Sequence, residues 1–208
     1  MQKRNYQKEM EKIIESFDKE QTPSLLLHSC CAPCSSYCLE YLSQYFKITV
    51  FYYNPNIYPE EEYQMRVREQ QDFIRRFPFD NPVDFVEGTY DTERFYATVK
   101  GLEKVKEGGE RCFACYRLRL TEAFEAADRL HMDYVTTTLS ISPLKKADQL
   151  NAIGEELAKS YRADYLVSDF KKKNGYKRSV EITSEYGMYR QDYCGCVFSM
   201  RERQNKTF

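Results

Sequence analysis

The chain has 208 residues, of which 42% are hydrophobic and 30% charged, with a formal net charge of −1. This balance is typical of a globular protein and excludes a disordered chain, and no apolar run reaches the roughly 18 residues that a membrane span requires. The near-neutral charge also excludes general nucleic-acid binding through an overall basic surface, so a nucleic-acid partner has to be held by a local patch.

The first 23 residues predict a helix that carries the apolar side chains of Ile13, Ile14 and Phe17 and ends at Pro23. The segment contains no apolar core of a signal peptide. We therefore expect an N-terminal helical extension over residues 1–23, followed by a single α/β domain over residues 24–208. The expected location is the reducing cytoplasm.

Five short runs of β-branched, aromatic or leucine residues predict strands at Leu25–His28, Ile48–Asn54, Val83–Glu87, Tyr134–Thr138 and Tyr165–Ser168. Helical patterns between them predict a first helix that includes Cys38, and further helices from Pro59 toward Phe77, from near Cys112 to Leu130 and from Ser142 to Ala158. A last helical region is expected between Val180 and Gln204. This alternation is typical of a parallel sheet with helices on both faces.

In an open parallel sheet, functional side chains gather beyond the carboxyl ends of the strands. The segments that follow the five predicted strands are reactive or polar: Cys30-Cys31, Asn54-Pro55-Asn56, Tyr90-Asp91, Ser140-Ile141-Ser142 and Asp169. We expect these segments to meet at one edge of the sheet although they are far apart in sequence. Asp91 and Asp169 are candidate proton donors or partners of ribose hydroxyls.

Seven of the 8 cysteines fall into three groups, namely Cys30, Cys31 and Cys34, then Cys112 and Cys115, then Cys194 and Cys196. In a reducing compartment, clustered thiols bind metal or carry out redox chemistry more often than they form structural disulfides. Four thiolates suit an iron–sulfur cube or a zinc ion. Because seven thiols exceed one tetrahedral site, the sequence predicts a second metal or a dithiol pair in addition.

Two other interpretations of the cysteines stay open at this point. The segment from Cys31 to Cys34 has the spacing of a thioredoxin-type motif after a strand, although this leaves the later cysteines without a role. The thiols could also be buried apolar residues or hold one structural zinc. Cys38 is expected to pack in the core, and His28 to be a packed strand residue instead of a metal ligand.

The densest basic segment is Lys171-Lys172-Lys173 with Lys177 and Arg178, and it includes Tyr176. Such a loop suits phosphate neutralisation with base stacking, or it is a solvated turn. Tyr189 and Arg190 lie shortly before Cys194 and are candidates for substrate contact.

Four segments together resemble the QueH-type epoxyqueuosine reductases: Leu27–Cys34, Tyr53–Ile57, Cys112–Arg119 and Tyr193–Cys196. The likeness extends from about Leu25 to Ser199. It implies a Rossmann-like fold related to the adenine-nucleotide α-hydrolases. It also implies reduction of the epoxide of epoxyqueuosine to queuosine at the wobble position of tRNA, the last step of queuosine biosynthesis.

The resemblance further implies a [4Fe–4S] cluster and a second metal nearby, expected to be iron. We assign Cys30, Cys31, Cys112 and Cys115 to the cluster and Cys34 to the second metal, a position at which some members carry aspartate. Cys194 and Cys196 are expected to form a redox-active pair or to bind the second metal. A partition with Cys194 on the cluster and Cys31 on the single metal fits the sequence equally well.

The candidate substrate-binding residues are Asn54, Asn56, Lys172, Tyr176, Arg178, Tyr189 and Arg190. The expected partners are tRNA carrying epoxyqueuosine and an external electron donor of the ferredoxin or flavodoxin type, with no membrane partner. Two rival functions remain: a thioredoxin-like thiol–disulfide oxidoreductase and a zinc-stapled RNA-binding protein without catalysis.

Overall fold

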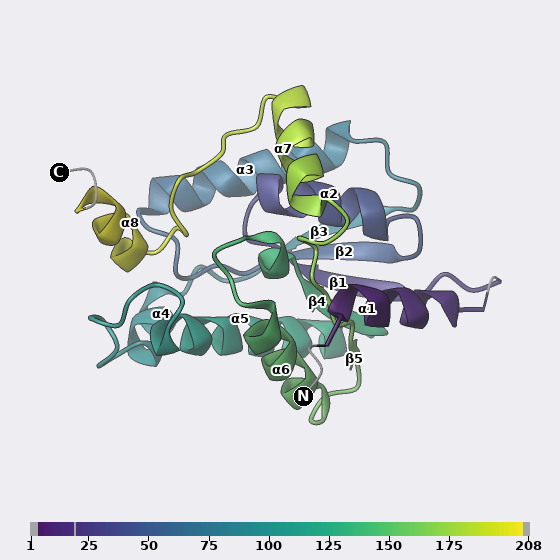
Figure 1. Cartoon of the computed structure of the whole chain (residues 1–208), viewed down its shortest axis with the longest axis horizontal. Coiled ribbons are helices and arrows are strands. Elements are labelled where there is room, and N and C mark those ends of the chain that lie inside the picture. The colour runs from purple at the N-terminus through teal and green to yellow at the C-terminus, as the bar shows by residue number, and fades with distance from the viewer. Residues whose placement is uncertain (1–3, 19, 206–208) are drawn as a thin grey trace.

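The computed structural model describes residues 4–18 and 20–205 (Figure 1). Its centre is a fully parallel sheet of five strands, β1 (Ser24–His28), β2 (Lys47–Tyr52), β3 (Val83–Glu87), β4 (Tyr134–Thr137) and β5 (Asp164–Tyr165). The strands follow the order β3-β2-β1-β4-β5, which is the order of the Rossmann fold. The predicted five-stranded parallel sheet is therefore confirmed.

The helices are α1 (Tyr6–Glu15), α2 (Ala32–Leu42), α3 (Glu60–Arg76), α4 (Thr92–Thr98), α5 (Glu110–Arg129), α6 (Ala147–Ala158), α7 (Gly175–Glu185) and α8 (Val197–Gln204), with a 3₁₀ turn, η1 (Thr138–Ile141). Helix α4 was not predicted, and α1 ends well before Pro23. The last helical region divides into α7 and α8. Within the described residues, no helix has both the length and the apolar character to cross a membrane.

The predicted fifth strand reaches Ser168, but β5 ends at Tyr165. The reason lies in Asn151 of α6, whose side-chain amide donates to the Ser168 carbonyl and accepts from the Ser168 N–H, both at 2.9 Å. A side chain thus takes the backbone groups that a strand would use. The chain leaves the sheet there and turns toward α7.

Side chains alternate between the two faces of the sheet and build two cores. Leu26 of β1 packs in the cluster that includes α5 and α6, whereas Leu25 and Leu27 pack in the cluster that includes α2 and α7. Figure 1 shows α2, α3 and α7 on one side of the sheet and α4, α5 and α6 on the other. Met10 of α1 is fully buried in the same cluster as Leu25 and Leu27. The predicted boundary at residue 23 between an N-terminal extension and the α/β domain stays a prediction.

The connections after β1 and β4 leave the sheet toward opposite faces. The helix α2 follows β1 and covers one face, while α6 follows β4 and covers the other. A crevice opens between such neighbouring strands at their carboxyl ends, where ligands bind in folds of this type.

Candidate metal centre and substrate cavity

The crevice begins with three thiols that come from one turn. Cys30, Cys31 and Cys34 place their sulfur atoms within 4.8 Å of one another, and the Sγ atoms of Cys30 and Cys31 are 3.8 Å apart. Adjacent residues converge here because β1 ends at His28 and Cys31 is the N-cap of α2. We call Cys30, Cys31 and Cys34 the front thiol group.

The pKa values of the three thiols in the front thiol group shift in different directions. Contacts with Cys31 and Cys34 lower the pKa of Cys30, whereas the same contacts with Cys30 raise the pKa of Cys31 to about 12 and raise that of Cys34. The Gln191 side-chain N–H donates to Cys31 Sγ at 2.9 Å. Because metal ligands must be deprotonated, metal binding to this group would release protons.

The remaining four clustered thiols form a back thiol group: Cys112, Cys115, Cys194 and Cys196. The first two lie in the opening turns of α5, and the other two lie in the segment before α8. Burial raises the pKa of Cys112, that of Cys115 to about 11 and that of Cys196 to about 12, and the charge of Cys194 adds to the rise in all three. Every cysteine of the chain is a free thiol.

Two cations connect the groups electrostatically. Arg119 of α5 interacts with Cys30 of the front group and with Cys115 and Cys194 of the back group. Lys145, in the loop before α6, interacts with Cys194, Cys30 and Cys34. Both thiol groups therefore lie around shared positive charges at the carboxyl edge of the sheet.

A buried network fixes Arg119. Its guanidinium donates to Asn54 Oδ1 and, at 3.3 Å, to His28 Nε2, while the Asn54 amide donates to the Ser29 carbonyl at 2.8 Å. Burial, with the charge of Arg119, lowers the pKa of His28 to about 3, so the imidazole is neutral, and its Nε2 also lies 3.1 Å from the Tyr53 carbonyl. His28 Nδ1 also contacts Thr137 Oγ1 at 2.9 Å. The expected role of His28 as a packed strand residue agrees with this burial.

A cavity of about 400 Å³ opens in front of the thiols. Its lining combines three thiols, the two cations and polar side chains of the C-terminal half: Cys30, Cys34, Cys194, Arg119, Lys145, Tyr176, Arg190, Gln191, Asp192 and Tyr193. The guanidinium of Arg190 stacks on the Tyr176 ring at 5.1 Å from its centroid. The volume falls in the range of small-molecule sites and is far too small for a folded macromolecule.

The structure brings only some of the predicted substrate-binding residues to this cavity. Tyr176 and Arg190 line it. Asn54 and Asn56 are buried, and Asn54 serves the Arg119 network. Contact between either asparagine and substrate stays a prediction.

Three other candidates lie away from the cavity. Arg178 pairs with Glu40 at 2.7 Å, Lys172 lines a separate pocket near α1, and Tyr189 projects outward with 44% of its surface exposed. Asp91 and Asp169 are also absent from the lining. Asp91 caps α4 by accepting from the Arg94 N–H, and Asp169 pairs with Lys171 at 2.8 Å.

Sequence reasoning gave no role to Arg119 or Lys145. Arg119 had a local signal, because it lies four residues after Cys115 and therefore on the same helix face. Lys145 had none, because its approach to the thiols depends on how the loop before α6 folds. Cys38 is fully buried, as expected, and its thiol donates to the Cys34 carbonyl at 3.4 Å.

The residues present suit a thiolate-bound metal centre. Three sulfur atoms already converge, and thiolate ligands select iron–sulfur clusters and zinc. Arg119 is only 1% exposed and makes no ion pair with a carboxylate in the part of the chain that the structure describes. A buried cation without a counter-charge is costly, so anionic metal-bound sulfur is the partner that this position fits.

Comparison with known proteins agrees with these observations. The family model described as epoxyqueuosine reductase QueH matches residues 25–202. The chain is similar to "Epoxyqueuosine reductase QueH" of Streptococcus pyogenes serotype M1, with 44% identity over 203 residues that cover 96% of this chain and 80% of the relative. The Staphylococcus aureus protein of the same name is 42% identical over 97% of this chain and 86% of its own length, and that of Thermotoga maritima is 34% identical over 88% and 93%.

Proposed function

The chain belongs to the epoxyqueuosine reductase QueH family, and on this basis we propose that it converts epoxyqueuosine in tRNA to queuosine at the wobble position. In this reaction both C–O bonds of the epoxide break and a carbon–carbon double bond forms. The substrate takes up two electrons and two protons, and the oxygen leaves as one water molecule. The enzyme is therefore an oxidoreductase of tRNA modification.

One observation supports the proposal most directly: a single cavity is lined by thiols of both groups together with cations that include Arg119 and Lys145. We propose that Cys30, Cys31, Cys112 and Cys115 hold a [4Fe–4S] cluster and that Cys34 holds a second metal, for which we propose iron. When bound, these centres supply electrons and Lewis acidity. Cys194 and Cys196 are proposed as a redox-active pair or as further ligands of the second metal.

The cavity cations complement the charge that develops in the reaction. Burial alone would lower the pKa of Lys145, but the nearby thiolates outweigh burial and raise it, so the ammonium stays charged. A fixed positive charge in a partly enclosed cavity stabilises negative charge on the epoxide oxygen as its C–O bonds break. We assign this role to Lys145, and we assign to Arg190, stacked on Tyr176, the orientation of the nucleoside.

The rival functions have less support. A disulfide exchanger needs an accessible thiolate, but Cys31 is fully buried and its pKa is raised to about 12 by contact with Cys30. A single zinc staple would leave three of the seven clustered thiols unused. We propose an external donor of the ferredoxin or flavodoxin type as the electron source. The reducing cytoplasm, where free thiols persist, is the proposed location.

The decisive experiment uses the protein reconstituted with iron and sulfide under anaerobic conditions. Incubated with a reductant and tRNA carrying epoxyqueuosine, it should yield queuosine, detected by mass spectrometry of the nucleosides as the loss of one oxygen atom. Cys30→Ser should lose iron and conversion together, because Cys30 belongs to the front thiol group. Cys38→Ser, a buried cysteine outside both groups, should keep both. Absence of conversion by iron-loaded wild-type protein would refute the proposal.

A further inference from the structure

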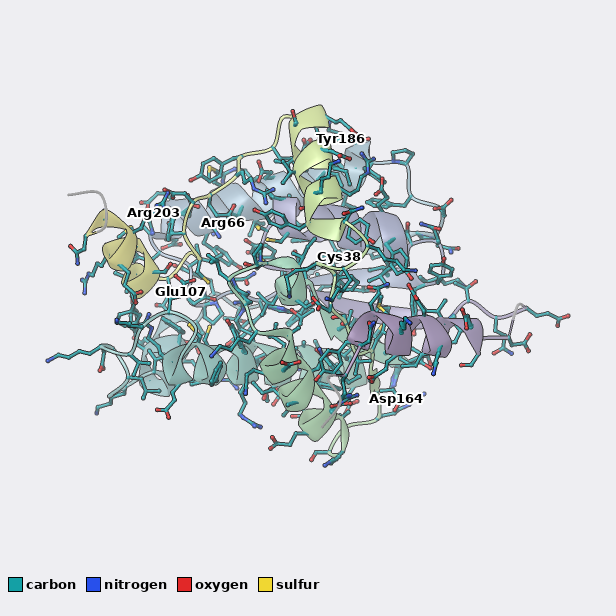
Figure 2. The ribbon with its side chains drawn as sticks, in the orientation of Figure 1. Cys38, Arg66, Glu107, Asp164, Tyr186 and Arg203 are labelled. Atoms are coloured by element: carbon teal, nitrogen blue, oxygen red, sulfur yellow. The ribbon has the colours of Figure 1, made fainter. Side chains whose placement is uncertain are left out.

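A second cavity adjoins the thiol cavity on the side of α8. It has a volume of about 870 Å³ and shares Glu107 and Leu144 with the smaller cavity, so the two are neighbours. We call it the α8 groove, and it is lined by Glu103, Lys104, Lys106, Glu107, Leu144, Phe198, Arg201, Glu202 and Asn205. Figure 2 shows Glu107 beside α8, at the end of the molecule opposite Asp164 of β5.

The cations of the α8 groove are uncommitted. Lys104, Lys106 and Arg201 are exposed, and among the described residues none of them pairs with a carboxylate. The carboxylates of the groove are engaged within the protein instead. Glu202 pairs with Arg111 at 2.8 Å, and Glu107 accepts from the Ser199 hydroxyl at 2.9 Å.

Glu103 is the remaining carboxylate of the groove. Its side chain accepts a hydrogen bond from the Gly101 N–H, two residues earlier, at 3.0 Å. The groove therefore combines two carboxylates that are bonded within the protein, Glu107 and Glu202, and one exposed carboxylate, Glu103, with three cations that face solvent. Its rim is also apolar in part, since Leu144 is 70% exposed. Free cations beside an apolar surface are what the phosphates and bases of an unpaired RNA segment require.

Most cations of the basic loop that stands out in the sequence are paired, and Lys172 is the exception among the described residues. Lys171 pairs with Asp169 at 2.8 Å, Lys173 with Glu11 at 2.5 Å and Arg178 with Glu40 at 2.7 Å. Ion pairs of this kind reduce the positive charge available to phosphate. Density of lysine in the sequence is thus a poor guide to the surface that can attract RNA.

The volumes of the two cavities indicate which part of the RNA each can hold. A volume of about 400 Å³ admits one nucleoside, so the rest of the RNA must remain outside, beside the entrance. Resting on the proposed function, we infer that the α8 groove is the docking surface for the phosphodiester backbone that flanks the reacting nucleoside. Lys104, Lys106 and Arg201 contact its phosphates.

The test measures binding of tRNA carrying epoxyqueuosine by iron-loaded protein across a salt series. The groove variant is Lys104→Gln/Lys106→Gln/Arg201→Gln. Each phosphate contact with single-stranded nucleic acid contributes about 0.7 to the slope of log K against log salt, so loss of three contacts should flatten the slope by about 2 and weaken binding on the order of 100-fold at about 0.1 M salt. All three residues are exposed, and circular dichroism checks that the variant is folded.

Two matched variants make the result specific. Lys12→Gln/Lys47→Gln/Lys159→Gln removes the same charge from exposed positions outside the groove and should weaken binding less than about threefold. Lys172→Gln/Lys173→Gln tests the rival basic loop.

Wild-type binding by the groove variant, equal losses in the groove and control triples, or a larger loss in the loop variant would each overturn the inference. In those cases wild-type protein still binds and reduces the tRNA, and the proposed function stands. If wild-type protein neither binds nor reduces it, the proposed function fails and the docking inference fails with it.

Discussion

The two thiol groups are assembled in different ways. The front thiol group lies within five consecutive residues, 30–34, at the end of the central strand β1, which pairs with both β2 and β4. The back thiol group joins α5 to a segment near residue 195 that belongs to no strand or helix. Local geometry is therefore sufficient for the first group, whereas the second depends on contacts between distant parts of the chain.

Few bonds hold that distant segment. The Tyr58 N–H donates to the Gly195 carbonyl and the Tyr193 hydroxyl donates to the Tyr58 carbonyl, both at 2.8 Å, and the Cys194 N–H donates to Ser199 Oγ at 3.1 Å. A segment tied by a few hydrogen bonds opens locally at low free energy, while the sheet opens only on global unfolding. Substitutions beside the front thiol group should consequently lower the global free energy of unfolding, whereas those beside the back thiol group should have smaller effects that favour local opening.

The largest effect is expected behind the front thiol group. Asn54→Leu removes the acceptor of the buried Arg119 and the donor to the Ser29 carbonyl, so it should lower the free energy of unfolding of the metal-free protein by about 3–5 kcal/mol. Urea denaturation measures this. Asn81→Leu is the control, because its amide also donates to a backbone carbonyl, that of Ser43, but in a partly buried place, and should cost about 1 kcal/mol. Equal losses would contradict a structural role specific to Asn54.

An intermediate and local effect is expected beside the back thiol group. Gly195 has a φ of +110°, and an added Cβ would lie 3.1 Å from Arg66 Nη1 and from Ile57 Cγ1. Gly195→Ala should destabilise the segment by about 1–3 kcal/mol. Iodoacetamide should then modify Cys194 of the metal-free protein on the order of 10-fold faster, because about 1.4 kcal/mol corresponds to that factor.

The control for this substitution is Gly187→Ala, which also has positive φ, at +63°, but no atom within 4 Å of the added Cβ. It should leave modification of Cys194 at the wild-type rate, and neither variant should change modification of Cys31. Faster modification of both cysteines in Gly195→Ala would mean that the two groups do not open independently.

The smallest effect is expected where the C-terminal segment touches the front group. Gln191→Leu removes one N–H···S bond to Cys31 and should lower the free energy of unfolding by about 0.5–1.5 kcal/mol. Gln44→Leu, which removes a bond to the exposed Glu40 carbonyl, should cost less. Thermal denaturation of the metal-free variants gives both values. A loss from Gln191→Leu as large as that from Asn54→Leu would mean that the C-terminal segment contributes as much to the free energy of unfolding as the buried Arg119 network.

The sequence was sufficient for the sheet but not for every boundary. The unbroken apolar run Leu25–Leu27 has the pattern of a central parallel strand buried on both faces, and β1 fulfils it. Ser168 reads as a strand residue just as well, and only the distant Asn151 takes its backbone out of the sheet. The sequence around Ser168 does not reveal that a distant side chain competes with the neighbouring strand for its backbone hydrogen bonds.

Prediction of the site was limited in the same way. Cys30, Cys31 and Cys34 meet because a strand ends and a helix begins, and both events leave marks in the sequence. Lys145 reaches the thiols through a loop, and Arg178 is withdrawn from possible ligands by Glu40, which lies 138 residues earlier in the chain. Charge density along a sequence does not reveal which charges are already paired.

The position of the back thiols along the chain also bears on biosynthesis. Among the described residues β5 is the last strand and ends at Tyr165, so every strand of the sheet is translated before Cys194 and Cys196. The growing polypeptide then presents the front thiols and α5 with an incomplete set of sulfur donors. Any step of metal delivery that uses Cys194 or Cys196 must consequently follow translation of all five strands.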